Sequence, residues 1–141
     1  MSEFLTLTRP DDWHLHLRDA AALAFTVPPT ARVFARAIVM PNLLPPVTSV
    51  AEALAYRARI LAAVPAGVSF EPHMALFLTE GTTPAELSAA AAHPHVIGAK
   101  LYPAGATTNS EAGVSAIGRL DEALACMQEV DLPLLVHGET V

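Results

Sequence analysis

The sequence predicts an α/β domain in which helices cover a parallel β-sheet. Short apolar runs alternate with helical patterns along the chain, and several of these runs are apolar throughout. Strands without a polar face are typical of parallel sheets, because helices bury both faces of such sheets. At 141 residues the chain is long enough for a real hydrophobic core, and we expect one domain over residues 1–141.

The N-terminal third is expected to contain two strands joined by a short helix. The first strand lies within residues 5–17. The helix follows over residues 20–25, and Pro28–Pro29 should end it because proline lacks the amide hydrogen that a helix interior needs. The second strand covers residues 33–40 and is broken at Pro41.

The clearest predicted helix covers residues 49–64. Ser49 is a good N-cap, and Glu52 three residues later would complete a capping box. Apolar residues at helical spacing should lie on one face of this helix. These residues are Val50, Leu54, Leu61 and Val64.

A third strand is expected over residues 69–78 and a fourth over residues 96–101. Between them, Thr83 as N-cap and Pro84 in the first turn predict a helix that runs to about residue 92.

A long loop is expected after the fourth strand. Residues 102–113 are mostly small or polar, and loops of this length in compact domains are often functional. A helix over residues 118–130 and a fifth strand over residues 132–137 complete the pattern. We expect Cys126 in that helix to be a small buried side chain.

Composition argues against several classes of protein. A hydrophobic fraction of 52% with 16% charged residues argues against disorder, and a net charge of −6 disfavours nucleic-acid binding. The mean hydropathy of +0.41 is high, but no clean apolar span of about 20 residues exists. A single cysteine cannot form an intramolecular disulfide, and the N-terminus lacks a signal-peptide pattern. We therefore expect a cytoplasmic protein without nucleic-acid or membrane partners.

Candidate functional residues follow the predicted strands. His14 and His16 end the first strand, Lys100 ends the fourth, His137 ends the fifth, and Asn42 follows the second. Functional side chains of parallel α/β proteins gather at this edge of the sheet. Residues two apart on a strand face the same side, and neutral imidazole is a common zinc ligand.

Arg18 follows His16 by two positions, so on a strand it would face the same side as the two histidines. Its guanidinium could then hold a substrate carboxylate in the same cavity. The alternative is a surface strand with solvated histidines. Other histidines are interpreted as structural or surface residues, namely His73, His93 and His95.

Lys100 lies in an apolar strand, where burial would lower the pKa of its amine. A neutral amine can react with carbon dioxide to form a carbamate, an anionic oxygen ligand that can bridge two metals. The alternative is a lysine whose charged end reaches solvent at the strand end. His137 could equally be a core histidine, and Glu139 could orient it or be solvated.

Four segments resemble the signature motifs of the shorter, bacterial-type dihydroorotases of the amidohydrolase superfamily. They occur in the family's order and span nearly the whole chain. The segments are Arg9–Asp19, Ala37–Leu43, Lys100–Ser110 and Pro133–Glu139.

The resemblance implies a (β/α)8 barrel of the TIM type with two zinc ions, of which this chain would contain the first five β/α units. By family motif, His14 and His16 would bind one zinc, His137 the second, and N6-carboxylated Lys100 both. The residues expected to contact substrate are His16, Arg18, Asn42, Thr107, Thr108 and His137. Thr107 and Thr108 match a loop that closes on substrate in this family.

The implied activity is the reversible conversion of N-carbamoyl-L-aspartate to L-dihydroorotate in pyrimidine biosynthesis, with a homodimer as the complete enzyme. A further histidine and the aspartate that acts as general acid and base are expected beyond residue 141. We therefore expect the 141-residue chain alone to be inactive or very weakly active. The alternatives are another cyclic amidohydrolase (similar to hydantoinase or allantoinase), a non-catalytic half-barrel that binds metal or a partner chain, or an α/β domain whose histidines have no function.

Overall fold

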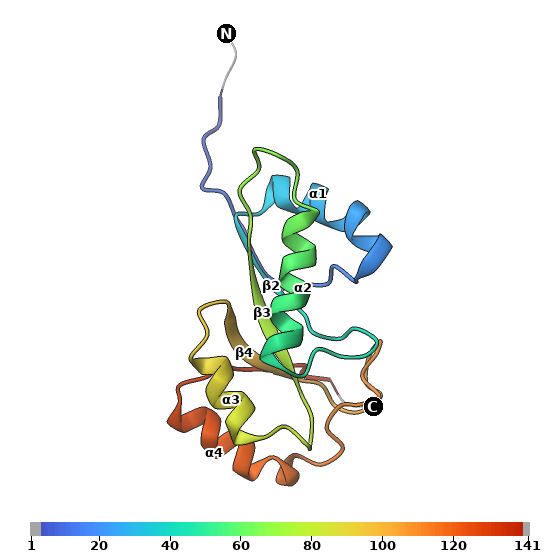
Figure 1. The fold of residues 1–141 in the computed structure, drawn as a ribbon, viewed down its shortest axis with the longest axis vertical. Coiled ribbons are helices and arrows are strands. Elements are labelled where there is room, and N and C mark those ends of the chain that lie inside the picture. Colours follow the sequence, from blue (N-terminus) through green and yellow to red (C-terminus); the bar gives the residue numbers. More distant parts are fainter. Residues whose placement is uncertain (1–3, 140–141) are drawn as a thin grey trace.

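The computed structural model describes residues 4–139, which form one five-stranded parallel sheet in the order β1-β2-β3-β4-β5 (Figure 1). The strands are β1 (Asp11–Leu15), β2 (Arg36–Val39), β3 (Glu71–Leu78), β4 (Val96–Leu101) and β5 (Leu134–Val136). The α-helices are α1 (Leu23–Val33), α2 (Val50–Ala62), α3 (Pro84–Ala91) and α4 (Asp121–Glu129), with short 3-10 helices η1 (Ala20–Ala22) and η2 (Ile117–Arg119).

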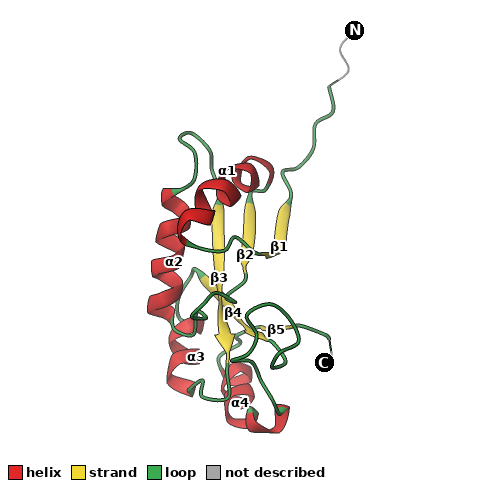
Figure 2. Cartoon of the chain, turned by 90° about the vertical axis from the view of Figure 1, so that its right-hand side faces the viewer, coloured by secondary structure: helices red, strands yellow, loops and turns green. Residues whose placement is uncertain are grey.

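Each strand pairs with the next strand in the sequence, and an α-helix lies between each pair. The helices lie on one side of the curled sheet (Figure 2). This arrangement is an open half-barrel, as expected for the first β/α units of a TIM-type barrel. It confirms the predicted fold class.

Both faces of the central strands are buried, as their continuous apolar sequences predict. The larger core lies between the sheet and the helices and includes Val27, Ile60 and Leu87, all inaccessible to solvent. A smaller cluster of Ile38, Met40 and Ala75 is packed with partly buried Ile97 and Leu135.

The predicted end of the first helix is wrong, because Pro28 and Pro29 lie inside α1. The two carbonyls that lose an amide partner belong to Ala24 and Phe25 (four residues earlier), which are exposed at the start of the helix. Water can bind those carbonyls, while Val27 and other core residues of α1 pack in the interior. The helix extends to Val33, so β2 is shorter than predicted.

The capping box of α2 is confirmed, and its predicted apolar face is only partly buried. Ser49 Oγ accepts from the Glu52 amide, and the Glu52 carboxylate accepts from the Ser49 amide. The buried residues of α2 are Ala53, Tyr56 and Ile60, whereas Leu61 is 37% exposed. Of the residues on the predicted face, Val50 and Val64 are partly buried against the core.

The remaining elements agree closely with prediction. Thr83 caps α3 with Pro84 in its first turn, and β4 has its predicted bounds. Cys126 is buried in α4. β5 ends at Val136, so His137 directly follows the strand. Within residues 4–139, no helix is both long and apolar enough to cross a membrane.

Candidate functional site

His14 and His16 meet at the C-terminal end of β1. Their Nε2 atoms are 3.2 Å apart. Two nitrogen ligands held about 2.0–2.1 Å from one zinc ion at a tetrahedral angle lie about 3.3 Å apart. The pair therefore has the spacing of two ligands on one ion.

Asn42 fixes the ring of His16. His16 Nδ1 lies 2.8 Å from Asn42 Oδ1, while Asn42 Nδ2 donates to the Thr108 carbonyl at 2.9 Å. A flipped amide would place two oxygens against each other at Thr108, so the observed orientation is the satisfied one. An amide oxygen only accepts, so this contact is a hydrogen bond in the His16 tautomer that carries its proton on Nδ1 and keeps the lone pair on Nε2.

Both imidazoles favour the neutral form. Burial lowers the pKa of His16 below its usual value, against the opposing effect of the Asn42 contact. Burial also lowers the pKa of His14, and the nearby side chains of Lys100 and His137 lower it further. Neutral imidazole is the form that binds metal.

Lys100 is buried at the end of β4, with 2% of its surface exposed. Its amine makes no hydrogen bond or ion pair with residues 4–139, and Nζ lies 5.2 Å from the centre of the Tyr102 ring. Burial lowers the pKa of the amine. The structure thus differs from the alternative in which this lysine reaches solvent.

His137 and Lys100 both lie close to the ring of Tyr102. The rings of His137 and Tyr102 are 5.6 Å apart, and the His137 amide donates to the Leu101 carbonyl at 3.0 Å. His137 Nε2 lies 3.2 Å from a Glu139 carboxylate oxygen but forms no hydrogen bond with any described residue. The Tyr102 hydroxyl is also buried without a hydrogen-bond partner in the described part of the chain.

The sequence did not single out Tyr102, although its place two residues after Lys100 was a usable signal. Considering histidine, cysteine, aspartate and glutamate alone, the described residues contain no group of three that could hold a metal. A metal site here would need the modified amine of Lys100, or further ligands, in addition to the histidines.

Arg18 does not continue the alternation predicted for the first strand, because β1 ends at Leu15 and Arg18 has a left-handed backbone with φ of 61°. Its carbonyl accepts from the Tyr56 hydroxyl. Arg18 lines a pocket of about 370 Å³ together with Asp19, Arg59 and Asn109, and the two histidines are not among the described residues that line it. The positive charge of Arg18 still contributes to the lowered pKa of His16.

The long loop after β4 is closed at its base by Val114. The Val114 amide donates to Tyr102 and its carbonyl accepts from Ala104. Gly113 lies so close to the Tyr102 carbonyl that a Cβ would approach it to 2.4 Å. Inside the loop, the Thr107 amide donates to the buried Ser110 hydroxyl, which donates back to the Thr107 carbonyl, while Thr108 accepts the hydrogen bond from Asn42.

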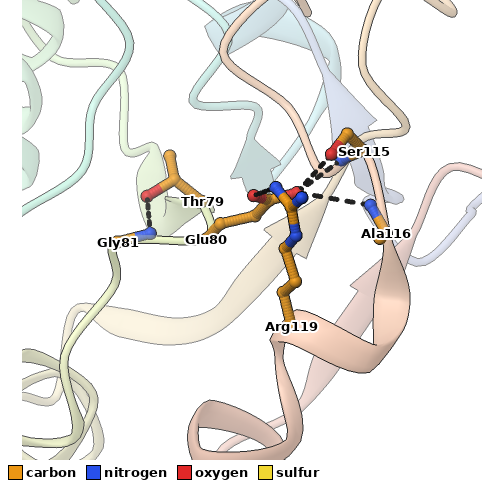
Figure 3. Close-up of polar contacts among 6 residues, drawn as sticks. All are labelled: Thr79, Glu80, Gly81, Ser115, Ala116 and Arg119. Carbon is orange, nitrogen blue, oxygen red and sulfur yellow. Dashed lines mark hydrogen bonds and ion pairs between the residues drawn. The ribbon is translucent and has the colours of Figure 1, made fainter.

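Glu80 anchors the segment after this loop (Figure 3). One carboxylate oxygen accepts from the amide and hydroxyl of Ser115 and from the Ala116 amide, at 2.6–3.2 Å. The other oxygen accepts from Arg119 at 2.6 Å. The Ser115 hydroxyl and then the Arg119 guanidinium lower the pKa of Glu80 to about 2. The local sequence does not indicate these contacts of Glu80, because they join residues 35 or more positions apart.

The three other histidines lie away from this site. His95 precedes β4 and lies 3.3 Å from the Glu71 carboxylate at the start of β3. The rings of His93 and His95 are 5.6 Å apart and tilted by 52°. His73 lies within β3 with a buried Nδ1 that has no partner among the described residues.

No family model matches the chain. It is 68% identical over 139 residues to a protein named dihydroorotase from Cupriavidus taiwanensis, covering 99% of this chain and 40% of that protein. A protein of the same name from Idiomarina loihiensis is 67% identical over 135 residues, 96% of this chain and 39% of the relative. The chain thus spans about two fifths of the length of the curated relatives it matches.

Two solved structures share the fold. The crystal structure of dihydroorotase from Campylobacter jejuni has a TM-score of 0.86 and 44% identity, covering 94% of this chain and 38% of that one. The structure of dihydroorotase in complex with 5-fluoroorotic acid from Saccharomyces cerevisiae has a TM-score of 0.84 and 32% identity. The match covers 94% of this chain and 36% of that one.

Proposed function

We propose that this chain, a homologue of dihydroorotases over 99% of its length, supplies metal-binding and substrate-binding residues of such an enzyme. The proposed reaction is the reversible hydrolysis of the ring amide of L-dihydroorotate to N-carbamoyl-L-aspartate. The observation that carries the proposal is the 3.2 Å approach of the His14 and His16 Nε2 atoms, at the same sheet edge as a buried lysine. The similar proteins described above are named dihydroorotase, so they do not favour another cyclic amidohydrolase or a non-catalytic half-barrel.

The donor set fits two zinc ions if Lys100 is carboxylated. His14 and His16 would hold one ion, His137 the other, and the Lys100 carbamate both. When bound, the ions would supply Lewis acidity and lower the pKa of a bound water to about 7.

The chemistry of Lys100 follows from its burial. The lone pair of its neutral amine forms a bond to the carbon of carbon dioxide, one C=O π pair moves to oxygen, and the amine releases a proton. Burial favours the neutral amine that this step requires. The product is an anionic oxygen ligand where the unmodified side chain is a cation.

Substrate recognition is proposed to begin with Arg18, whose planar guanidinium suits a carboxylate. Asn42 can add a second contact, because Nδ2 carries two hydrogens and one is directed to Thr108. The full set of proposed substrate contacts is His16, Arg18, Asn42, Thr107, Thr108 and His137. The complete enzyme is proposed to be a cytoplasmic homodimer that takes its acid–base aspartate from outside these 141 residues.

The test uses the complete protein that contains this chain. We expect hydrolysis of L-dihydroorotate, followed by ultraviolet absorbance, and two zinc ions per chain by elemental analysis. His16→Ala should lower activity at least a hundredfold and reduce the zinc content. His93→Ala, which changes a histidine away from the site, is the matched control. Full activity of His16→Ala with unchanged zinc would overturn the proposal.

A further inference from the structure

Asn42 connects the loop after β4 to His16. It is 2% exposed and uses three groups. Oδ1 contacts His16 Nδ1 at 2.8 Å, Nδ2 donates to the Thr108 carbonyl at 2.9 Å, and the Asn42 carbonyl accepts from Asn109 Nδ2 at 3.1 Å.

The contacts with Asn42 hold the tip of the loop, residues 105–112, against the rest of the protein. Among residues 4–139, every hydrogen bond from positions 105–112 to a residue outside the loop ends on Asn42. The other hydrogen bonds of this tip stay within the loop, mainly around the buried Ser110 side chain. Loss of the Asn42 contacts would therefore leave the tip held only by its base and by packing.

The orientation of the Asn42 side-chain amide also decides which nitrogen of His16 carries the proton. The Thr108 carbonyl can only accept, so it faces the NH2 end of the amide, and the oxygen end then faces His16. An oxygen at that place requires a proton on Nδ1 of His16. His16 Nε2 then has no hydrogen, so the 3.2 Å contact with His14 requires the hydrogen on His14 Nε2.

We propose that Asn42 is a positioning residue that couples the docked loop to one tautomer of His16, with the proton on Nδ1 and the Nε2 lone pair free. With Thr108 docked, only one orientation of the amide is satisfied. With the loop displaced, the amide is free to turn, and both His16 tautomers become accessible. The inference rests on the proposed function only in treating Nε2 as the metal-binding atom.

The test is made on the complete, metal-free protein, so that no metal imposes the tautomer. Nitrogen-15 NMR of labelled histidine, at about pH 8 where imidazole is ordinarily neutral, distinguishes the two ring nitrogens. His16→Gln assigns the signal. We expect wild-type His16 to carry its proton on Nδ1 and His14 on Nε2. Hydrogen exchange of peptides within residues 104–113 reports on loop docking.

Two variants of Asn42 separate its contact with Thr108 from its contact with His16. Asn42→Asp has nearly the same shape and still accepts from His16, but it cannot donate to Thr108. We expect an unchanged His16 tautomer and roughly tenfold faster loop exchange. Asn42→Ala loses both contacts, so the loop should exchange at least as fast and His16 should populate both tautomers.

Asn109→Gly is the matched control. Glycine accepts the φ of 57° at this position, and the substitution removes only the bond to the Asn42 carbonyl. We expect a smaller rise in loop exchange and no change at His16. The inference is overturned if wild-type His16 carries its proton on Nε2, or if Asn42→Asp, folded by circular dichroism, leaves loop exchange unchanged. Neither measurement needs zinc or turnover, so failure here is distinguishable from failure of the proposed function.

Discussion

On the helix-covered side of the sheet, Arg57 reaches two acceptors, the Glu71 carboxylate at 2.6 Å and the Pro72 carbonyl at 3.1 Å. At the C-terminal edge, Lys100 is more deeply buried and reaches no acceptor within residues 4–139. The Tyr102 hydroxyl and His137 Nε2 beside it are also without hydrogen bonds there. Buried polar groups are normally satisfied, and those that are not need an explanation. The two regions therefore differ in how their polar groups are satisfied, since the charged group on the helix side is paired and those at the C-terminal edge have no hydrogen-bond partner among the described residues.

The largest effect on stability is expected on the helix side. Ile60→Ala removes a side chain with no exposed surface and should lower the free energy of unfolding by about 2–5 kcal/mol. Leu61→Ala is the matched control, because Leu61 is 37% exposed, and it should cost clearly less. Urea unfolding of the complete protein measures both. Equal costs would mean that the buried face of α2 is not the one containing Ile60.

Replacing the two basic side chains by methionine should have opposite effects. Lys100→Met removes a buried, unpartnered amine, so it should stabilise the metal-free protein by about 1–3 kcal/mol while abolishing dihydroorotate hydrolysis. Arg57→Met leaves the Glu71 and Pro72 acceptors without their donor and should destabilise by a similar amount. Denaturant unfolding gives the sign of each change. Destabilisation by both variants would contradict the contrast between the two regions.

The smallest effect is a pH dependence at Glu80. Its pKa is about 2 in the folded protein, below the usual 4.5, so its contribution to stability is full above about pH 4.5. The contribution declines as the pH falls from 4.5 towards 2. The difference in unfolding free energy between wild type and Glu80→Gln should therefore be larger at pH 7 than at pH 3. A difference that does not change with pH would mean that Glu80 does not hold Ser115 and Arg119 through its charge.

Local sequence signals predicted the elements that local chemistry determines. The capping box at Ser49, the N-cap at Thr83 and the apolar run of β4 needed no knowledge of distant residues. The same holds for Lys100 and His137, because the ends of parallel strands meet at one edge of the sheet.

Features that depend on packing could not be predicted in this way. The prolines of α1 are tolerated because the affected turn is exposed and the rest of the helix is anchored in the core. Arg18 was placed on a strand that in fact ends at Leu15. The contact between Asn42 and Thr108 joins residues 66 positions apart, and nothing in either local sequence specifies it.

The most direct test of the central claim is anomalous X-ray diffraction at the zinc absorption edge, on crystals of the complete protein grown with zinc and bicarbonate. The account predicts two anomalous peaks, one within ligand distance of His14 and His16 and one beside His137, with carbamate density on the Lys100 amine between them. An unmodified Lys100 with no anomalous peak at these histidines would contradict it.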